Sequence, residues 1–325
     1  MRNVRRHVGA VALAATLLLG ALPGLAQACY SGDDIDPALA AALHEAVAGY
    51  AQAAQAGDKA KLQPNAEFDL GDVLASNQTL LSGAATVHSL YVLESNAAAS
   101  PADSSRRVQY FCGIYNSSDR VGFVFDGLPP GRYGIAIEDL AGKIAARATW
   151  ILHQSGSQWK IAGFYVKPAE IAGHDAQWYV TQARSYKASG KIHDAWLYYL
   201  TASELARPFP AMVTPKLEAL YDEMQAAKPG DFPGDNPVEL TAGGRSFKIS
   251  EIFPTPVGDN LDVVVRYLEP DISDTNRVFH SNMELIQALV AKFPELRDAF
   301  VAVVARAVAP NGQDYGSMLA MKDVK

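Results

Sequence analysis

The hydrophobic and polar positions of the first half of the chain change period once, and each period predicts a different element. Pro37 to Ala56 has apolar residues three and four positions apart, which predicts a helix with Asp36 as its N-cap. From Ala84 the period is two, which predicts a strand. Turn signals separate five further strand-like runs, at 107–115, 121–125, 132–137, 145–154 and 159–166. One helix and six closely spaced strands predict an α+β unit with an antiparallel sheet.

The second half of the chain returns to a helical period before a second set of strands. Ala176 to Arg207 predicts two helices with a turn at Gly190, and Pro215 to Ala227 predicts a third. Lys228 to Pro237 holds three prolines and two glycines, which exclude regular structure and mark a boundary. Beyond it we predict a small ββαββ unit, with strands at 245–253, 261–268, 300–308 and 315–321 and a helix at 283–293.

The first residues have the three regions of a secretory signal. Arg2, Arg5 and Arg6 precede an uncharged apolar run, which Ala26-Gln27-Ala28 follows as a small-x-small cleavage site. The run is shorter than the roughly 20 residues that span a bilayer, although an uncleaved anchor helix is the alternative. We therefore predict cleavage after Ala28 and an exported chain, periplasmic or secreted.

Cleavage there leaves Cys29 at the new N-terminus, and Cys112 is the other cysteine. In an oxidising compartment the two can form a disulfide. Lipoprotein signals are also cleaved before a cysteine, which is then acylated, but Ala26 stands where such signals usually have leucine. Acylation would consume the thiol of Cys29, so the two outcomes exclude each other. A buried free Cys112 is a third alternative.

The predicted closing hairpin carries a resemblance to a known superfamily. Thr149 to Leu152, Gly156 and Trp159 to Phe164 resemble the last hairpin of nuclear transport factor 2-like domains. The resemblance covers Asp36 to Pro168 and implies a cone in which a bent sheet wraps a helix. Some members of the superfamily use the cone cavity for catalysis, which implies Asp139 or His153 as acid–base residues of an enzyme.

The helical stretch carries a second resemblance. Tyr186, Gly190, Ala195, Tyr199 and Ala202 occupy the signature positions of a tetratricopeptide repeat. Because a stable array needs about three repeats, we interpret this single unit as a helical hairpin lying on a neighbouring domain. The resulting division is a signal peptide at 1–28, a cone-like α+β domain at 36–168, a helical hairpin region at 172–228, a linker at 229–237 and a small α+β domain at 238–325.

Apolar groups at the short junction between Val166 and Ala176 predict that the first sheet and the helical hairpin form one body, with the ββαββ unit as a second. The linker between them, with few apolar anchors, is predicted to be the interior site most sensitive to proteases.

Composition and charge exclude some partners. The chain has 49% hydrophobic and 19% charged residues, which suits a globular protein, and its net charge of −7 argues against nucleic acid. We find no zinc-hydrolase motif, calcium loop, nucleophile elbow or phosphate-binding loop, so we predict no metal and no cofactor. His174-Asp175 and His193-Asp194 are interpreted as helix starts with surface histidines. Glu269, Asp271 and Asp274 are interpreted as a solvated loop.

These observations predict an exported, non-catalytic binding or scaffolding protein of a bacterial-type envelope or exterior. Its partner would be a protein or a small molecule, and it would meet a membrane only through a lipid on Cys29. The alternative is an enzyme that uses a pocket of the cone-like domain around Asp139 and His153.

Overall fold

The computed structural model describes residues 28–95, 107–113 and 117–325, so the predicted signal segment up to residue 27 lies outside the described residues. The first unit contains a five-stranded antiparallel sheet in the order β1-β2-β5-β6-β7. Its strands are β1 (Ala28–Ser31), β2 (Ala84–Ser95), β5 (Gly131–Ala141), β6 (Ala146–Ser155) and β7 (Gln158–Pro168). Three helices accompany it: α1 (Pro37–Gln55), α2 (Lys59–Leu62) and α3 (Gly71–Leu81).

Helix α1 begins as predicted, since an Asp36 carboxylate oxygen accepts a hydrogen bond from the Leu39 amide at 3.0 Å. Its buried face packs on the sheet, and Leu43 lies directly over Gly134 of β5. A side chain at position 134 would collide with Leu43, so the glycine allows the close approach of helix and strand. An α+β architecture is therefore present, as predicted.

The six predicted strands do not form one sheet, which corrects the sequence interpretation. β3 (Arg107–Cys112) and β4 (Val121–Asp126) leave the main sheet and form a second one with β10 (Met212–Val213), in the order β10-β4-β3. One core lies between α1, α3 and the main sheet, and another lies between the main sheet and β3–β4. Both faces of the five-stranded sheet are therefore covered.

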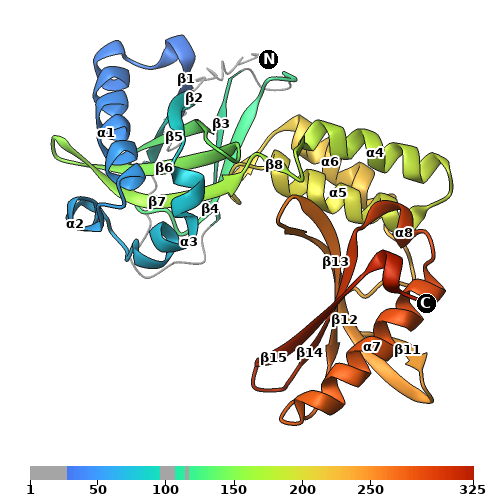
Figure 1. Cartoon of the computed structure of the whole chain (residues 1–325). Helices are drawn as coiled ribbons and strands as arrows, with labels where there is room; N and C mark the ends of the chain where they lie inside the picture. Colours follow the sequence, from blue (N-terminus) through green and yellow to red (C-terminus); the bar gives the residue numbers. More distant parts are fainter. Residues whose placement is uncertain (1–27, 96–106, 114–116) are drawn as a thin grey trace, which may run out of the picture.

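The helical hairpin forms close to its predicted bounds. It consists of α4 (Ala176–Ala188) and α5 (Ile192–Ala206), with Gly190 in the left-handed region at φ 80°, and α6 (Pro215–Gln225) follows. A small two-stranded ladder, β8 (Glu170–Ile171) with β9 (His174–Asp175), connects β7 to α4. Figure 1 shows α4–α6 between the first unit and the C-terminal sheet.

The C-terminal unit is a five-stranded sheet in the order β11-β12-β13-β14-β15. β13 and β14 are parallel, and α7 forms the crossover between them. The sequence prediction missed β11 and began the long helix eight residues late. The elements are β11 (Val238–Ala242), β12 (Arg245–Val257), β13 (Asn260–Leu268), α7 (Thr275–Lys292), α8 (Leu296–Ala299), β14 (Ala302–Val308) and β15 (Asp314–Ala320).

The largest core joins α4–α6 to the C-terminal sheet and α7. This packing corrects the expectation that the hairpin belongs with the first sheet. The hairpin contacts the first unit mainly through the α5–α6 loop, whose Phe209 and Met212 are buried in the core beside β4. The predicted linker also has an apolar anchor, because Phe232 is only 5% exposed and belongs to the largest core. Among the described residues, no helix is both long and apolar enough to cross a membrane.

Candidate functional site

The two cysteines form a disulfide that joins the two sheets of the first unit. Cys29 of β1 and Cys112 of β3 are bonded, with 4.9 Å between their Cα atoms. The bond fastens the start of the described chain to a strand 83 residues later. The predicted disulfide is thus confirmed, and a buried free Cys112 is excluded in this structure. A Cys29 sulfur held in this bond is not available for acylation.

A cleft of about 690 Å³ lies between the first unit and α4–α6. One wall comes from β2, β5 and β6, and the other from α4 and α6 with the end of α5. The lining combines buried apolar residues with partly or fully exposed ionisable groups from both walls. The apolar residues include Ile137, Val180, Leu205, Met212 and Leu217, and the ionisable ones are His88, Arg147, Asp175, Arg184, Lys216 and Glu223.

A β-bulge shapes the sheet wall of this cleft. The register between β2 and β5 shifts between Val87 and Ser89, which makes His88 the extra residue. Because of the bulge, the consecutive residues His88 and Ser89 both line the cleft. His88 Nδ1 lies 3.1 Å from an Asp139 carboxylate oxygen, and Arg147 Nε donates to the other at 3.0 Å. Asp139 therefore holds two cationic or titratable groups at the edge of the cleft.

The helical wall carries a second charged group. Arg184 of α4 donates two hydrogen bonds, each 2.8 Å long, to the carboxylate of Glu223 on α6. The Tyr199 hydroxyl donates to the same carboxylate at 2.6 Å. The hydrogen bonds from Arg184 lower the pKa of Glu223 to about 2, so this side chain is ionised at neutral pH. The contact also ties α4 to α6 and fixes the position of that wall.

The structure does not bring Asp139 and His153 together. Asp139 pairs with Arg147 and His153 pairs with Tyr133, so the two residues lie six positions apart along the sheet, roughly 20 Å. His153 instead contacts Glu67 at 2.9 Å and stacks on the Tyr133 ring. Of the two residues that the resemblance suggested, only Asp139 belongs to the cleft region.

The space between α1 and the main sheet is packed with side chains. Leu43, Val47 and Trp150 are fully buried there. Glu138 lies in the same layer, 3% exposed, and accepts a hydrogen bond from Trp150 Nε1 at 2.6 Å. Burial raises the pKa of Glu138, although the bond from Trp150 opposes the shift. This carboxylate is a core group rather than part of an open pocket.

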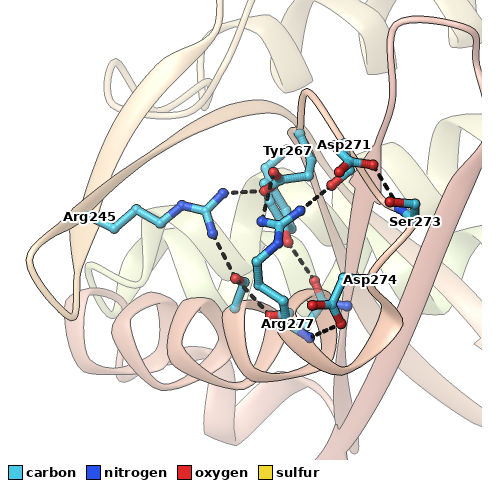
Figure 2. Close-up of polar contacts among 9 residues, drawn as sticks. Arg245, Tyr267, Asp271, Ser273, Asp274 and Arg277 are labelled. Atoms are coloured by element: carbon cyan, nitrogen blue, oxygen red, sulfur yellow. Dashed lines mark hydrogen bonds and ion pairs between the residues drawn. The ribbon is translucent and has the colours of Figure 1, made fainter.

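The three acids around Pro270 have separate roles, and Figure 2 shows Asp271 and Asp274 each with its own partner. Asp274 caps α7 by accepting from the Arg277 amide at 3.0 Å, and Asp271 accepts from the Ser273 amide at 2.9 Å. Glu269 is different, because its side chain is only 4% exposed and contacts the guanidinium groups of Arg245 and Arg277. The interpretation as a solvated loop is therefore wrong for Glu269.

His193, from the His193-Asp194 pair at the start of α5, was interpreted as a surface histidine, and this interpretation is wrong as well. The His193 side chain is 13% exposed, with Nδ1 2.6 Å from Glu295 and Nε2 2.9 Å from Asp231. Asp194 is fully buried. His193 thus links α5, the 229–237 segment and the residues before α8. Among the described residues, no group of three or more His, Cys, Asp or Glu side chains has the arrangement of a metal site.

Comparisons with protein-family models, with curated proteins and with solved structures found no match to this chain.

Proposed function

We propose that this chain is an exported binding protein that holds a small organic ligand in the cleft between the first sheet and α4–α6. The observation that carries the proposal is the cleft itself. Its volume of about 690 Å³ falls in the range of small-molecule sites, roughly 300–1,000 Å³, and it lies where two units of the fold meet. An apolar interior with a few charged groups around it is the usual composition of such sites.

Both walls of the cleft are held in place before any ligand arrives, which supports a binding role. The Arg184–Glu223 contact fixes the helical wall, and the Asp139 contacts to His88 and Arg147 fix the sheet wall. The α5–α6 loop closes the base of the cleft, since β10 pairs with β4 and Phe209 stacks on Phe123. A preformed site loses less conformational entropy on binding.

Export is part of the proposal. The signal-like first residues support it, and the Cys29–Cys112 bond is compatible with an oxidising compartment. The cone-like and tetratricopeptide-like assignments of the first unit and the hairpin are retained as proposals. Acylation of Cys29 is the alternative to the Cys29–Cys112 disulfide, and the intact mass of the exported protein distinguishes the acylated form from the disulfide-bonded one.

A substitution that fills the cleft tests the binding proposal. Ala219 is an exposed residue of α6 that lines the cleft, whereas Ala226, just after the same helix, does not. Native mass spectrometry and a thermal-shift screen of amino acids, sugars and organic acids would identify a ligand. Ala219→Trp should abolish its binding and Ala226→Trp should preserve it. Failure to find any bound compound, or equal binding by both variants, contradicts the proposal.

A second candidate is an enzyme, favoured by the imidazole–carboxylate contact between His88 and Asp139 at the edge of the cleft. A histidine beside a carboxylate can act as a general base. If a compound from the screen is turned over, His88→Gln should lower kcat about 100-fold or more while the compound still binds. Turnover that His88→Gln leaves unchanged would rule out this role, and binding without turnover supports the first candidate.

A further inference from the structure

The C-terminal sheet has one face covered by α7 and another that is open to solvent at the end of the strands around Leu268. Tyr267 and Ala307 belong to the core beneath α7, so the residues that follow them, Leu268 and Val308, lie on the opposite face. Leu268 is 46% exposed, and Met318 of β15, on the same face, is 59% exposed. Figure 1 shows α7 running along one side of the sheet. The exposed part of the face opposite α7 is therefore available to a ligand.

A cavity of about 580 Å³ lies on that face, at the end of the strands that is remote from the helical hairpin. Lys248, Leu268 and Val308 are paired across β12, β13 and β14, and they form one row of its floor. Ser246 lies on the same face as Lys248, two residues earlier in β12. Pro270, Ala309 and Pro310 close the end of the cavity.

The charges around this cavity favour an anion. Lys248 lines it and takes part in no hydrogen bond or ion pair among the described residues. Arg245, which also lines it, is held at Nη1 by the Ser281 hydroxyl at 2.7 Å. The one acid of the lining, Glu269, is engaged by both Arg245 and Arg277, so its charge is already balanced. Among the residues that line the cavity, Arg245, Lys248 and Glu269 leave one net positive charge, and Glu239, which faces Lys248 from β11, accepts a hydrogen bond from the Ser246 hydroxyl at 3.1 Å.

The apolar part of the lining indicates the shape of the ligand. It consists of Leu268, Val308, Ala309 and two prolines and contains no aromatic side chain. Aromatic rings and nucleobases are usually held by stacking on aromatic side chains, whereas a flexible aliphatic chain needs only a continuous aliphatic surface. A single positive charge beside such a surface suits one anionic headgroup.

We propose that this cavity binds a carboxylate that carries a flexible aliphatic chain, in the class of medium-chain fatty acids. The headgroup would pair with Lys248, and the chain would lie over Leu268 and Val308. The site is separate from the cleft beside α4–α6, and the inference does not depend on the function proposed for that cleft.

Isothermal titration of the full chain with sodium dodecanoate, kept below its micelle concentration, tests the inference. Dodecyltrimethylammonium carries the same chain with the opposite charge and serves as the matched probe. Dodecanoate should bind with 1:1 stoichiometry and at least about tenfold more tightly than the cation, which corresponds to one charge-assisted contact. Equal affinity of the two probes, or no binding of dodecanoate, overturns the proposal.

Variants of exposed residues locate the site without threatening the fold. Lys248→Gln should weaken dodecanoate binding about tenfold, and Leu268→Ser should weaken it by a similar factor. Lys322→Gln, at an exposed lysine elsewhere in the C-terminal unit, should leave it unchanged. Ala219→Trp in the cleft should also have no effect. Binding that is lost in Ala219→Trp but retained in Lys248→Gln would place the ligand in the cleft and refute this assignment.

Discussion

Two carboxylates of this chain are almost equally inaccessible but have opposite surroundings. Glu269 is 4% exposed, and each of its oxygens contacts one guanidinium group, from Arg245 and from Arg277. Asp194 at the start of α5 is 0% exposed, and neither of its oxygens has a hydrogen-bond partner among the described residues. Burial is similar in the two regions, so any difference in their behaviour has to come from the partners.

The difference shows that burial alone does not determine whether an acid stabilises a fold. Burial, with the nearby Glu295 carboxylate adding to it, raises the pKa of Asp194 to about 8, so this group carries a proton at neutral pH. Glu269 instead joins the end of β13 to β12 and to α7 through its two arginines. A paired buried carboxylate fastens elements together, whereas an unpaired one costs free energy once it is ionised.

The largest effect is expected from removing the paired acid. Glu269→Ala leaves two partly exposed arginines without their shared partner, and we expect a loss of about 2–4 kcal/mol in the free energy of unfolding. Glu251→Ala is the matched control, because the Arg266–Glu251 pair on the same sheet is exposed and should contribute at most about 1 kcal/mol. Urea denaturation measures both variants, and equal losses would show that the burial of Glu269 has no energetic role.

Asp194 should behave in the opposite way, and its effect should depend on pH. Between its ordinary pKa of 3.8 and about 8, the folded state holds a proton that the unfolded chain releases. The free energy of unfolding therefore falls as the pH rises through this window. Asp194→Asn should be close to the wild type at pH 4 and more stable by about 1–3 kcal/mol at pH 8.

Asp222→Asn, at an exposed acid of α6, controls for the change in net charge and should show no such trend. A parallel pH dependence in the wild type and Asp194→Asn would mean that Asp194 ionises normally.

His193, next to Asp194, is a paired group, and its contacts link α5 to the 229–237 segment and to the residues before α8. Both ring nitrogens contact carboxylate oxygens, Nδ1 that of Glu295 and Nε2 that of Asp231. Burial acts to raise the pKa of Asp231, but the contact with His193, together with a backbone hydrogen bond and Lys292, holds that pKa below its usual range. The ring also packs against Phe232 and Phe293.

His193→Gln can keep at most one of the two bonds in place, and we expect a loss of about 1–2 kcal/mol. Amide exchange around Phe232 should become faster in the variant, because the 229–237 segment loses one of its attachments. His153→Gln is the control, since His153 contacts one carboxylate only and should cost less. Unchanged exchange at Phe232 would show that the segment is held by its apolar contact alone.

The sequence allowed most elements of the fold to be predicted, because their patterns are local. The capped start of α1 and the Gly190 turn are examples that the structure confirms. The separation of β3 and β4 into a second sheet could not be predicted, since their partner β10 comes about ninety residues later in the chain. Helix α3 was missed because its polar residues interrupt the apolar period, and β11 was missed as well.

The candidate sites were harder to predict, because many of their charged contacts join residues that are far apart in the chain. Arg184 and Glu223 are 39 residues apart, and His193 and Glu295 are 102 apart. The bulge at His88 cannot be recognised from an alternating pattern. An extra residue changes which face of the sheet the neighbouring side chains occupy, but not the composition of the strand. Only the disulfide could be predicted as a pair, because a chain with two cysteines allows one pairing.

The smallest effect is expected at a third buried acid, Glu138, which has fewer partners than Glu269 and more than Asp194. Glu138 has one partner, the indole N–H of Trp150, and burial raises its pKa despite that bond. Glu138→Gln keeps an oxygen that can accept the same bond, so the free energy of unfolding should change by less than about 1 kcal/mol at pH 5. Because the folded state holds the proton of Glu138 more tightly than the unfolded chain, the wild type should lose stability relative to the variant as the pH rises.

Urea denaturation at pH 5 and pH 8 measures the difference between the wild type and Glu138→Gln, and Trp150 fluorescence reports whether the indole contact survives. Glu138→Ala, which removes the acceptor, should cost more at both pH values, and a larger loss in Glu138→Gln than in Glu138→Ala would contradict the role of that single hydrogen bond.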